Sequence, residues 1–167
     1  MSTDIEKLVK EAVLKITNEQ ATEQIPKKRI DFISLADAKL ICEKVERRAK
    51  EMGVNAVVAI ADEGGNLKIC ECMDNSFIAS RDIAINKAYT SVALKMSTKK
   101  LSSLAAPGGS LYGIQHTNGG RIVIFGGGDT LECRGKILGG LGVSGGTEEE
   151  DTALSAYGKK IFGEYFN

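Results

Sequence analysis

The chain has little of what several common kinds of site require. Its 167 residues include no tryptophan, two prolines and a single histidine, His116. A Ser-His-Asp triad or a multi-histidine metal site would have to be built on that one residue, which makes both poor candidates. No apolar run reaches the ~18 residues that a membrane-spanning helix needs, and no secretory leader is evident. We therefore expect a cytoplasmic protein with no membrane contact.

An excess of charge of one sign is also missing, because 22 lysines and arginines balance 22 aspartates and glutamates. Proteins that bind nucleic acid usually carry a basic patch or excess, so we expect no nucleic-acid partner. The four cysteines are unevenly spaced, which is typical of a reducing compartment and predicts no disulfides. A hydrophobic content of 43% is enough to fill one core without such cross-links.

The N-terminal segment stands apart from the rest. Residues 4–18 have the apolar spacing of one helix face, whereas residues 17–31 are polar, contain Pro26 and lack periodicity. We divide the chain into a helix plus linker over 1–33 and a domain over 34–167. Two roles stay open for the helix: it packs on the domain or a neighbouring subunit, or it docks into the groove of a partner.

The domain is expected to alternate helices and strands. Ser34 and Asp37 form a capping signal for a helix that ends at Gly53, and Thr147 caps a closing helix. Thr98 is expected to cap a short helix after a longer one over 77–96. Strands are expected at residues 54–61, 67–72, 121–125, 130–133 and 137–143. This order predicts an α+β fold with one five-stranded antiparallel sheet.

Fifteen of the 19 glycines lie between Gly108 and Gly158. The runs at 126–128 and 145–146 have two interpretations: turns and bulges in a tight sheet, which we favour, or backbone amides that line a ligand. A bound phosphate would be repelled by the acidic residues 148–151 at the start of the last helix. No Gly-rich nucleotide motif precedes a helix.

Three ordered motifs carry a family resemblance: AIADEGGNL at 59–67, IAINKA at 83–88, and RIVIFGGG with KILGGLGVSGG and TEEED over 121–151. Over residues 34–163 the chain resembles the GlcG/HbpS family, which includes the heme-binding C-terminal domain of the propanediol-utilisation corrinoid adenosyltransferase. The resemblance implies a five-stranded, profilin-like sheet, a homo-oligomer and heme as a cofactor. Adenosyl transfer belongs to a separate domain of that enzyme, and residues 1–33 are too short to form it.

A heme site needs an apolar slot with an axial ligand or a cation at its rim. The segment containing Tyr112, His116 and Arg121 alone offers aromatic, imidazole and guanidinium groups together. His116 is either a heme ligand or, as we favour, a solvent-facing loop residue. Lys87, in the second motif, either contacts a propionate or extends its ammonium group into water from a mostly buried helix face.

The cysteines suggest a second kind of site. Cys70 and Cys72 are two residues apart on an expected strand, so both point to one face, and Cys133 is expected on another strand. Three thiolates would still leave zinc without a fourth ligand. We therefore favour buried, apolar cysteines.

Three functional hypotheses follow. The leading one is a non-enzymatic heme-binding or accessory protein, homo-oligomeric and associated with a bacterial microcompartment through residues 1–18. The second is an enzyme acting on a small metabolite, with its pocket between the loop over 107–120 and the glycine-rich strands. The absence of a recognisable nucleophile-base or carboxylate pair weakens that hypothesis. The third is a structural assembly module.

Overall fold

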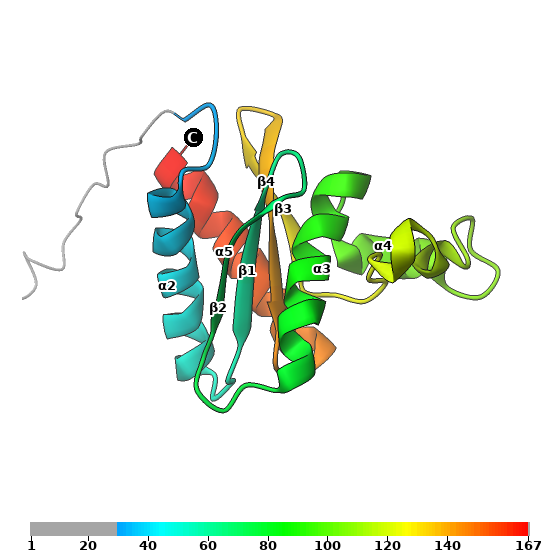
Figure 1. Ribbon diagram of the computed structural model, residues 1–167, viewed down its shortest axis with the longest axis horizontal. Helices are drawn as coiled ribbons and strands as arrows, with labels where there is room; N and C mark the ends of the chain where they lie inside the picture. Colours follow the sequence, from blue (N-terminus) through cyan, green and yellow to red (C-terminus); the bar gives the residue numbers. More distant parts are fainter. Residues whose placement is uncertain (1–29, 167) are drawn as a thin grey trace, which may run out of the picture.

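The computed structural model describes residues 30–166, which form an antiparallel sheet with helices on both faces (Figure 1). The strands lie in the order β2-β1-β4-β3, so β2 and β3 are the two edges. The elements are α2 (Leu35–Glu51), β1 (Val57–Asp62), β2 (Leu67–Cys72), α3 (Ile78–Leu94), α4 (Thr98–Ala105), the 3-10 turns η1 (Ile114–His116) and η2 (Asn118–Gly120), β3 (Gly128–Cys133), β4 (Lys136–Ser144) and α5 (Glu148–Phe166). The predicted α+β class with one antiparallel sheet is confirmed.

The predicted start of α2 is confirmed by its cap. The Asp37 amide donates to Ser34 Oγ at 3.2 Å, and the Ser34 amide donates to Asp37 Oδ2 at 3.1 Å. This reciprocal capping box satisfies amides that have no partner within the helix. The apolar stripe of the helix, including Ile41 and Val45, is buried. The capping signal at Ser34 and Asp37 therefore predicted the start of α2 correctly.

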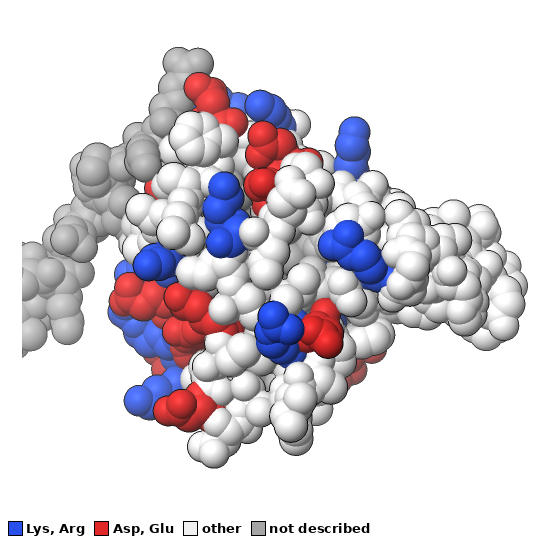
Figure 2. Space-filling view, viewed as in Figure 1, with Lys and Arg blue, Asp and Glu red and all other residues white. Residues whose placement is uncertain are grey.

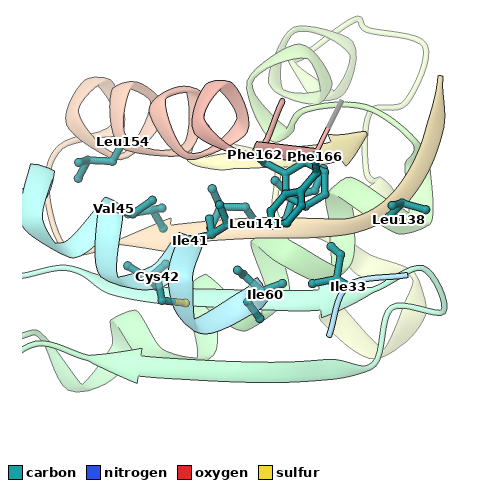
Figure 3. Close-up of a cluster of buried hydrophobic side chains, with 14 of the residues drawn as sticks. Ile33, Ile41, Cys42, Val45, Ile60, Leu138, Leu141, Leu154, Phe162 and Phe166 are labelled. Carbon is teal, nitrogen blue, oxygen red and sulfur yellow. The ribbon is translucent and has the colours of Figure 1, made fainter. Parts of the chain in front are cut away.

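The sheet is covered by different helices on its two sides. Residues of α2 and α5 form one core cluster with alternate residues of β1 and β4, including Ile60 and Leu141. The opposite face of β1 packs against Ala84 and Ala88 of α3. Figure 3 shows the first cluster, in which Phe162 and Phe166 of α5 stack beside Leu141. The cluster also includes Ile30 and Ile33, so the packed region extends upstream of residue 34.

Glycines in β4 allow α3 to lie directly on the sheet. A Cβ atom at Gly142 would overlap the Ala84 carbonyl oxygen, and one at Gly140 would overlap that of Ala88. Any larger residue would push the helix away, because both obstacles are backbone atoms. The glycines of β4 therefore serve the close packing of α3 on the sheet.

The prediction of a strand at residues 121–125 is wrong, and the sheet has four strands instead of five. Thr90 of α3 holds this segment through its side chain. Its hydroxyl donates to the Arg121 carbonyl oxygen at 3.2 Å and accepts from the Val123 amide at 3.0 Å. Backbone groups that bind a helix side chain are not available for a strand ladder. The segment therefore crosses α3 as an irregular connection.

Thr98 was also misassigned as a cap. Ser97 caps α4, accepting from the Lys100 amide at 3.2 Å. Thr98 is buried and accepts from the Gly128 amide at 2.9 Å, where β3 begins. Beyond α4, residues 106–120 extend away from the sheet (Figure 1). Within residues 30–166, no helix is long and apolar enough to cross a membrane.

Candidate functional site

A buried ion pair joins α3 to the first turn of α5. Lys87 Nζ donates to Asp151 Oδ2 at 2.7 Å and to the Val143 carbonyl oxygen at 2.8 Å. The Lys87 side chain is fully buried and that of Asp151 is 5% exposed. The Phe125 ring covers the ammonium group, with its centroid 4.9 Å away. The two charges are therefore shielded from water and depend on one another.

Burial shifts both members of the pair toward their neutral forms. Desolvation lowers the pKa of Lys87 and raises the pKa of Asp151. Their mutual hydrogen bond and attraction oppose both shifts. The Gly146 amide, which donates to Asp151 Oδ1 at 3.0 Å, opposes the shift of Asp151 alone. Removing either partner would leave an uncompensated charge in the interior.

A pocket of about 400 Å³ opens beside this pair. Phe77, Ile83 and Phe125 supply apolar walls, while Asp151 and Glu148 bring carboxylates to the lining. Ser144 and Ser80, both buried, add a hydroxyl pair joined by a 3.1 Å hydrogen bond. The remaining lining residues are Ala79, Gly145 and Gly146. Exposed apolar rings beside buried polar groups suit a small molecule with one polar group.

Lys87 is the one predicted site residue that adjoins this pocket, through Asp151 and Phe125. The interpretation that its ammonium group reaches water is wrong, because the side chain is fully buried. Asp151 was not predicted as its partner, because the acidic run at 148–151 indicates only the start of a helix. The signal was present: a lysine on a buried helix face requires a carboxylate elsewhere in the chain.

The other three predicted residues lie elsewhere: Tyr112 and His116 on the extension after α4, and Arg121 directly after it. Tyr112 and His116 are exposed there. The Arg121 guanidinium stacks over the Tyr89 ring of α3, 3.6 Å from its centroid, and Asn118 donates to the Tyr89 hydroxyl at 3.2 Å. None of the three lines the pocket, which the glycine-rich 145–146 turn reaches but the loop over 107–120 does not. This pocket therefore does not lie at the loop over 107–120, where a pocket was predicted.

The extension is chemically distinctive because residues 105–120 contain no Asp, Glu, Lys or Arg. Figure 2 shows it as a largely uncoloured projection from a surface otherwise dotted with charges. The Gln115 side-chain oxygen is buried and has no hydrogen-bond partner among the described residues, although the Gln115 amide nitrogen lies 3.4 Å from His116 Nε2. A buried acceptor without a partner marks a place where a further group is expected.

The cysteines do not form the three-thiol arrangement that was considered for zinc. Cys70 and Cys72 lie on edge strand β2, whereas Cys133 lies on β3 at the opposite edge. Cys42 and Cys133 are buried as favoured, but that interpretation is wrong for exposed Cys72 and only partly fits half-buried Cys70. Among residues 30–166, no three or more His, Cys, Asp or Glu side chains are grouped to hold a metal ion.

Comparison with known proteins identifies the family. The family described as haem-degrading protein HbpS-like matches residues 33–159. The chain belongs to the HbpS-like family. The predicted family resemblance is therefore confirmed. An uncharacterised 15.0 kDa Citrobacter freundii protein from a dhaT-dhaS intergenic region is 44% identical over 136 residues, 81% of this chain and 96% of that protein.

Relatives of this HbpS-like chain include larger proteins. The corrinoid adenosyltransferase PduO of Citrobacter freundii is 41% identical over 108 residues, which cover 65% of this chain but 32% of that enzyme. Among solved structures, Klebsiella pneumoniae protein ORFY is 39% identical with a TM-score of 0.77, covering 82% of this chain and 94% of that one. A PduOC:heme complex is 34% identical with a TM-score of 0.74, covering 77% and 94%.

Proposed function

We propose that this HbpS-like protein binds heme or a related tetrapyrrole as a non-enzymatic accessory protein. The observation that carries the proposal is its 34% identity to a relative whose structure is a heme complex, over nearly the whole length of that relative. The uncharged extension over residues 105–120 supplies a second argument, since it presents an exposed imidazole and an aromatic ring on one projecting surface.

The side chains of the extension fit one face of a heme. His116 offers an axial nitrogen, and Tyr112 offers an exposed ring against which a macrocycle can pack. Arg121, held over Tyr89, keeps a fixed cation near the base of the extension for a propionate. Bound heme would supply a redox-active iron. Because these groups form a projection instead of an enclosed slot, we propose that a second copy of the chain covers the other face in a homo-oligomer.

Lys87 is the weaker propionate candidate. Its ammonium group already donates to Asp151 and to the Val143 carbonyl, and Phe125 covers it. A propionate would have to displace one of these partners. We therefore propose that Lys87 stabilises the neighbouring pocket through Asp151, and that Tyr112, His116 and Arg121 contact the heme.

Hemin titration tests the proposal. Wild-type protein should give a saturable Soret shift, and His116→Ala should change its position and weaken affinity if the imidazole is axial. Ser110→Ala, a substitution at an exposed position of the extension, controls for disturbance of the extension. Equal spectra and affinities for wild type and His116→Ala would remove His116 from the site. No saturable Soret change in either protein would end the heme proposal.

We also propose that residues 1–18 direct the protein to a microcompartment shell or its cargo. This segment lies outside the described residues, and the proposal rests on its amphipathic pattern and the relationship to PduO. Deletion should stop at Arg29, because Ile30 belongs to the core. A protein lacking residues 1–29 should keep its melting temperature but lose co-localisation with shells. A large fall in melting temperature would instead assign the segment to packing.

The alternative function, an enzyme for a small metabolite, is favoured by a single observation. The 400 Å³ pocket places Asp151 and the Ser80–Ser144 hydroxyl pair beneath apolar walls. A panel of small alcohols, aldehydes and hydroxy acids tested by thermal shift would examine this alternative. A ligand that stabilises the wild type but not Phe125→Ala would place binding in the pocket, and turnover of that ligand would be needed to establish an enzyme.

A further inference from the structure

Two cysteines, Cys70 and Cys72, lie on the edge strand β2 of the sheet. Cys70 and Cys72 of β2 pair with Ala59 and Val57 of β1, so both side chains leave the strand on the face that carries α3. Antiparallel pairing with β1 fixes the backbone under both cysteines, which keeps their side chains on the same face, two positions apart along the strand.

The pair is accessible from solvent. β2 is an edge strand, so no further strand of the sheet covers its outer side. Cys72 is exposed, and Cys70 is half-buried and packs against the core cluster that includes Ala84 and Ala88 of α3. The other two cysteines differ, since Cys42 is buried in the core and Cys133 donates to the Phe166 carbonyl oxygen at 2.8 Å. Cys70 and Cys72 are therefore the thiols of residues 30–166 that are arranged to act together.

We propose that Cys70 and Cys72 form a two-coordinate site for a soft, thiophilic metal ion, with Cu(I) as the probe. Thiolates select soft ions such as Cu(I), whereas a structural zinc site needs four ligands. No third or fourth His, Cys, Asp or Glu ligand gathers around these thiols in the described part of the chain, which disfavours zinc. Binding forms two S–Cu bonds and releases the two thiol protons to solvent, while copper stays Cu(I) and no electron is transferred.

Charges on α3 adjust this site. Burial and then the neighbouring Cys72 raise the pKa of the Cys70 thiol, Arg81 lowers it and Asp82 raises it, and together they bring it to about 11. A Cu(I) ion held by two thiolates carries a net charge of −1. Arg81 should stabilise that complex and Asp82 should destabilise it. Both residues are exposed and paired with each other at 3.2 Å, so their effects should be small and sensitive to salt.

The test is anaerobic competition for Cu(I) against bathocuproine disulfonate, using the reduced, heme-free full chain. Wild type should retain one Cu(I) per chain. Cys72→Ser and Cys70→Ser should each weaken binding by at least ~100-fold, exceeding the 10–100-fold cost of losing an outer-shell partner. Cys133→Ala should bind like wild type. At low salt, Arg81→Gln should weaken binding about two- to fivefold and Asp82→Asn should strengthen it similarly.

A second measurement uses wild-type protein alone, so its result does not depend on whether the cysteine variants fold. In wild-type protein, bound Cu(I) should protect Cys70 and Cys72 from alkylation, as read by mass spectrometry of the peptide that contains both. Failure to retain Cu(I), or equal affinity in wild type, Cys70→Ser and Cys72→Ser, would overturn the proposal. Alkylation of both thiols at the same rate with and without Cu(I) would also overturn it. None of these results bears on heme binding.

Discussion

Lys87 and Asp151 are 64 positions apart in the chain and meet at 2.7 Å, where α3 from one side of the sheet approaches the start of α5 from the other. Gly127 passes so close that a Cβ there would lie 2.7 Å from Lys87 Nζ. The pair therefore connects both helical layers to the turn before β3. It also supplies a wall of the pocket through Asp151.

Removing one member of this pair should strongly destabilise the protein. Lys87→Met and Asp151→Leu each leave a single buried charge, and we expect each to lower the free energy of unfolding by about 3–5 kcal/mol. Urea denaturation followed by circular dichroism measures this cost. The double variant Lys87→Met/Asp151→Leu should recover most of the loss, because no unpaired charge remains. Additive losses in the double variant would show that the two side chains are not energetically coupled.

The free energy of unfolding should fall as the pH rises toward the raised pKa of Glu46. Burial, followed by the charge and hydrogen bond of Glu71, raises the pKa of Glu46 to about 7. Between the ordinary glutamate range and that value the folded state holds more protons than the unfolded state, so rising pH favours unfolding. Denaturation at pH 5, 6, 7 and 8 should show the decline. It should flatten in Glu46→Gln and persist in Glu63→Gln, which changes an exposed glutamate that is not among the charges acting on Glu46. An unchanged slope in Glu46→Gln would contradict the assignment.

The close approach of α3 to β4 should make Gly142 intolerant of any side chain. Gly142→Ala places a methyl group against the Ala84 carbonyl, and we expect a cost of at least the ~1–3 kcal/mol typical of overpacking. Gly53→Ala is the matched control: its φ of +74° is strained for alanine, but no atom lies within 4 Å of the new Cβ. That change should cost only ~1–2 kcal/mol. A Gly142→Ala cost below the control would show that α3 can shift freely.

The proposed homo-oligomer should depend on the apolar start of α3. Ile78 is 97% exposed and Phe77 is 70% exposed, which is unusual unless another surface covers them. Light scattering coupled to size exclusion should report several times 17.8 kDa for the wild type. Ile78→Lys should shift the mass toward the monomer, whereas Leu67→Lys at the far end of β2 should not. A monomeric wild type at micromolar concentration would reject the oligomer.

The sequence by itself determined the α+β class, the cap of α2, the hairpin of β1 and β2, and the family, because these follow from local signals. Apolar periodicity, capping residues and turn chemistry act within a few residues, and the family motifs are contiguous. The order of the motifs also placed Lys87 on a helix. These predictions required no knowledge of which segments are neighbours in space.

Only the tertiary structure decided the rest. Residues 121–125 have strand-like composition, but Thr90 of α3 binds their backbone and leaves four strands in the sheet. The partner of Lys87 lies in an acidic run whose local pattern indicates nothing beyond a helix start, so the pairing had to come from packing. Likewise, the strand period in the sequence places Cys70 and Cys72 on one face. Only the order of strands in the folded sheet shows that their strand is an edge. Long-range neighbours are set by how layers pack, and no local pattern encodes that.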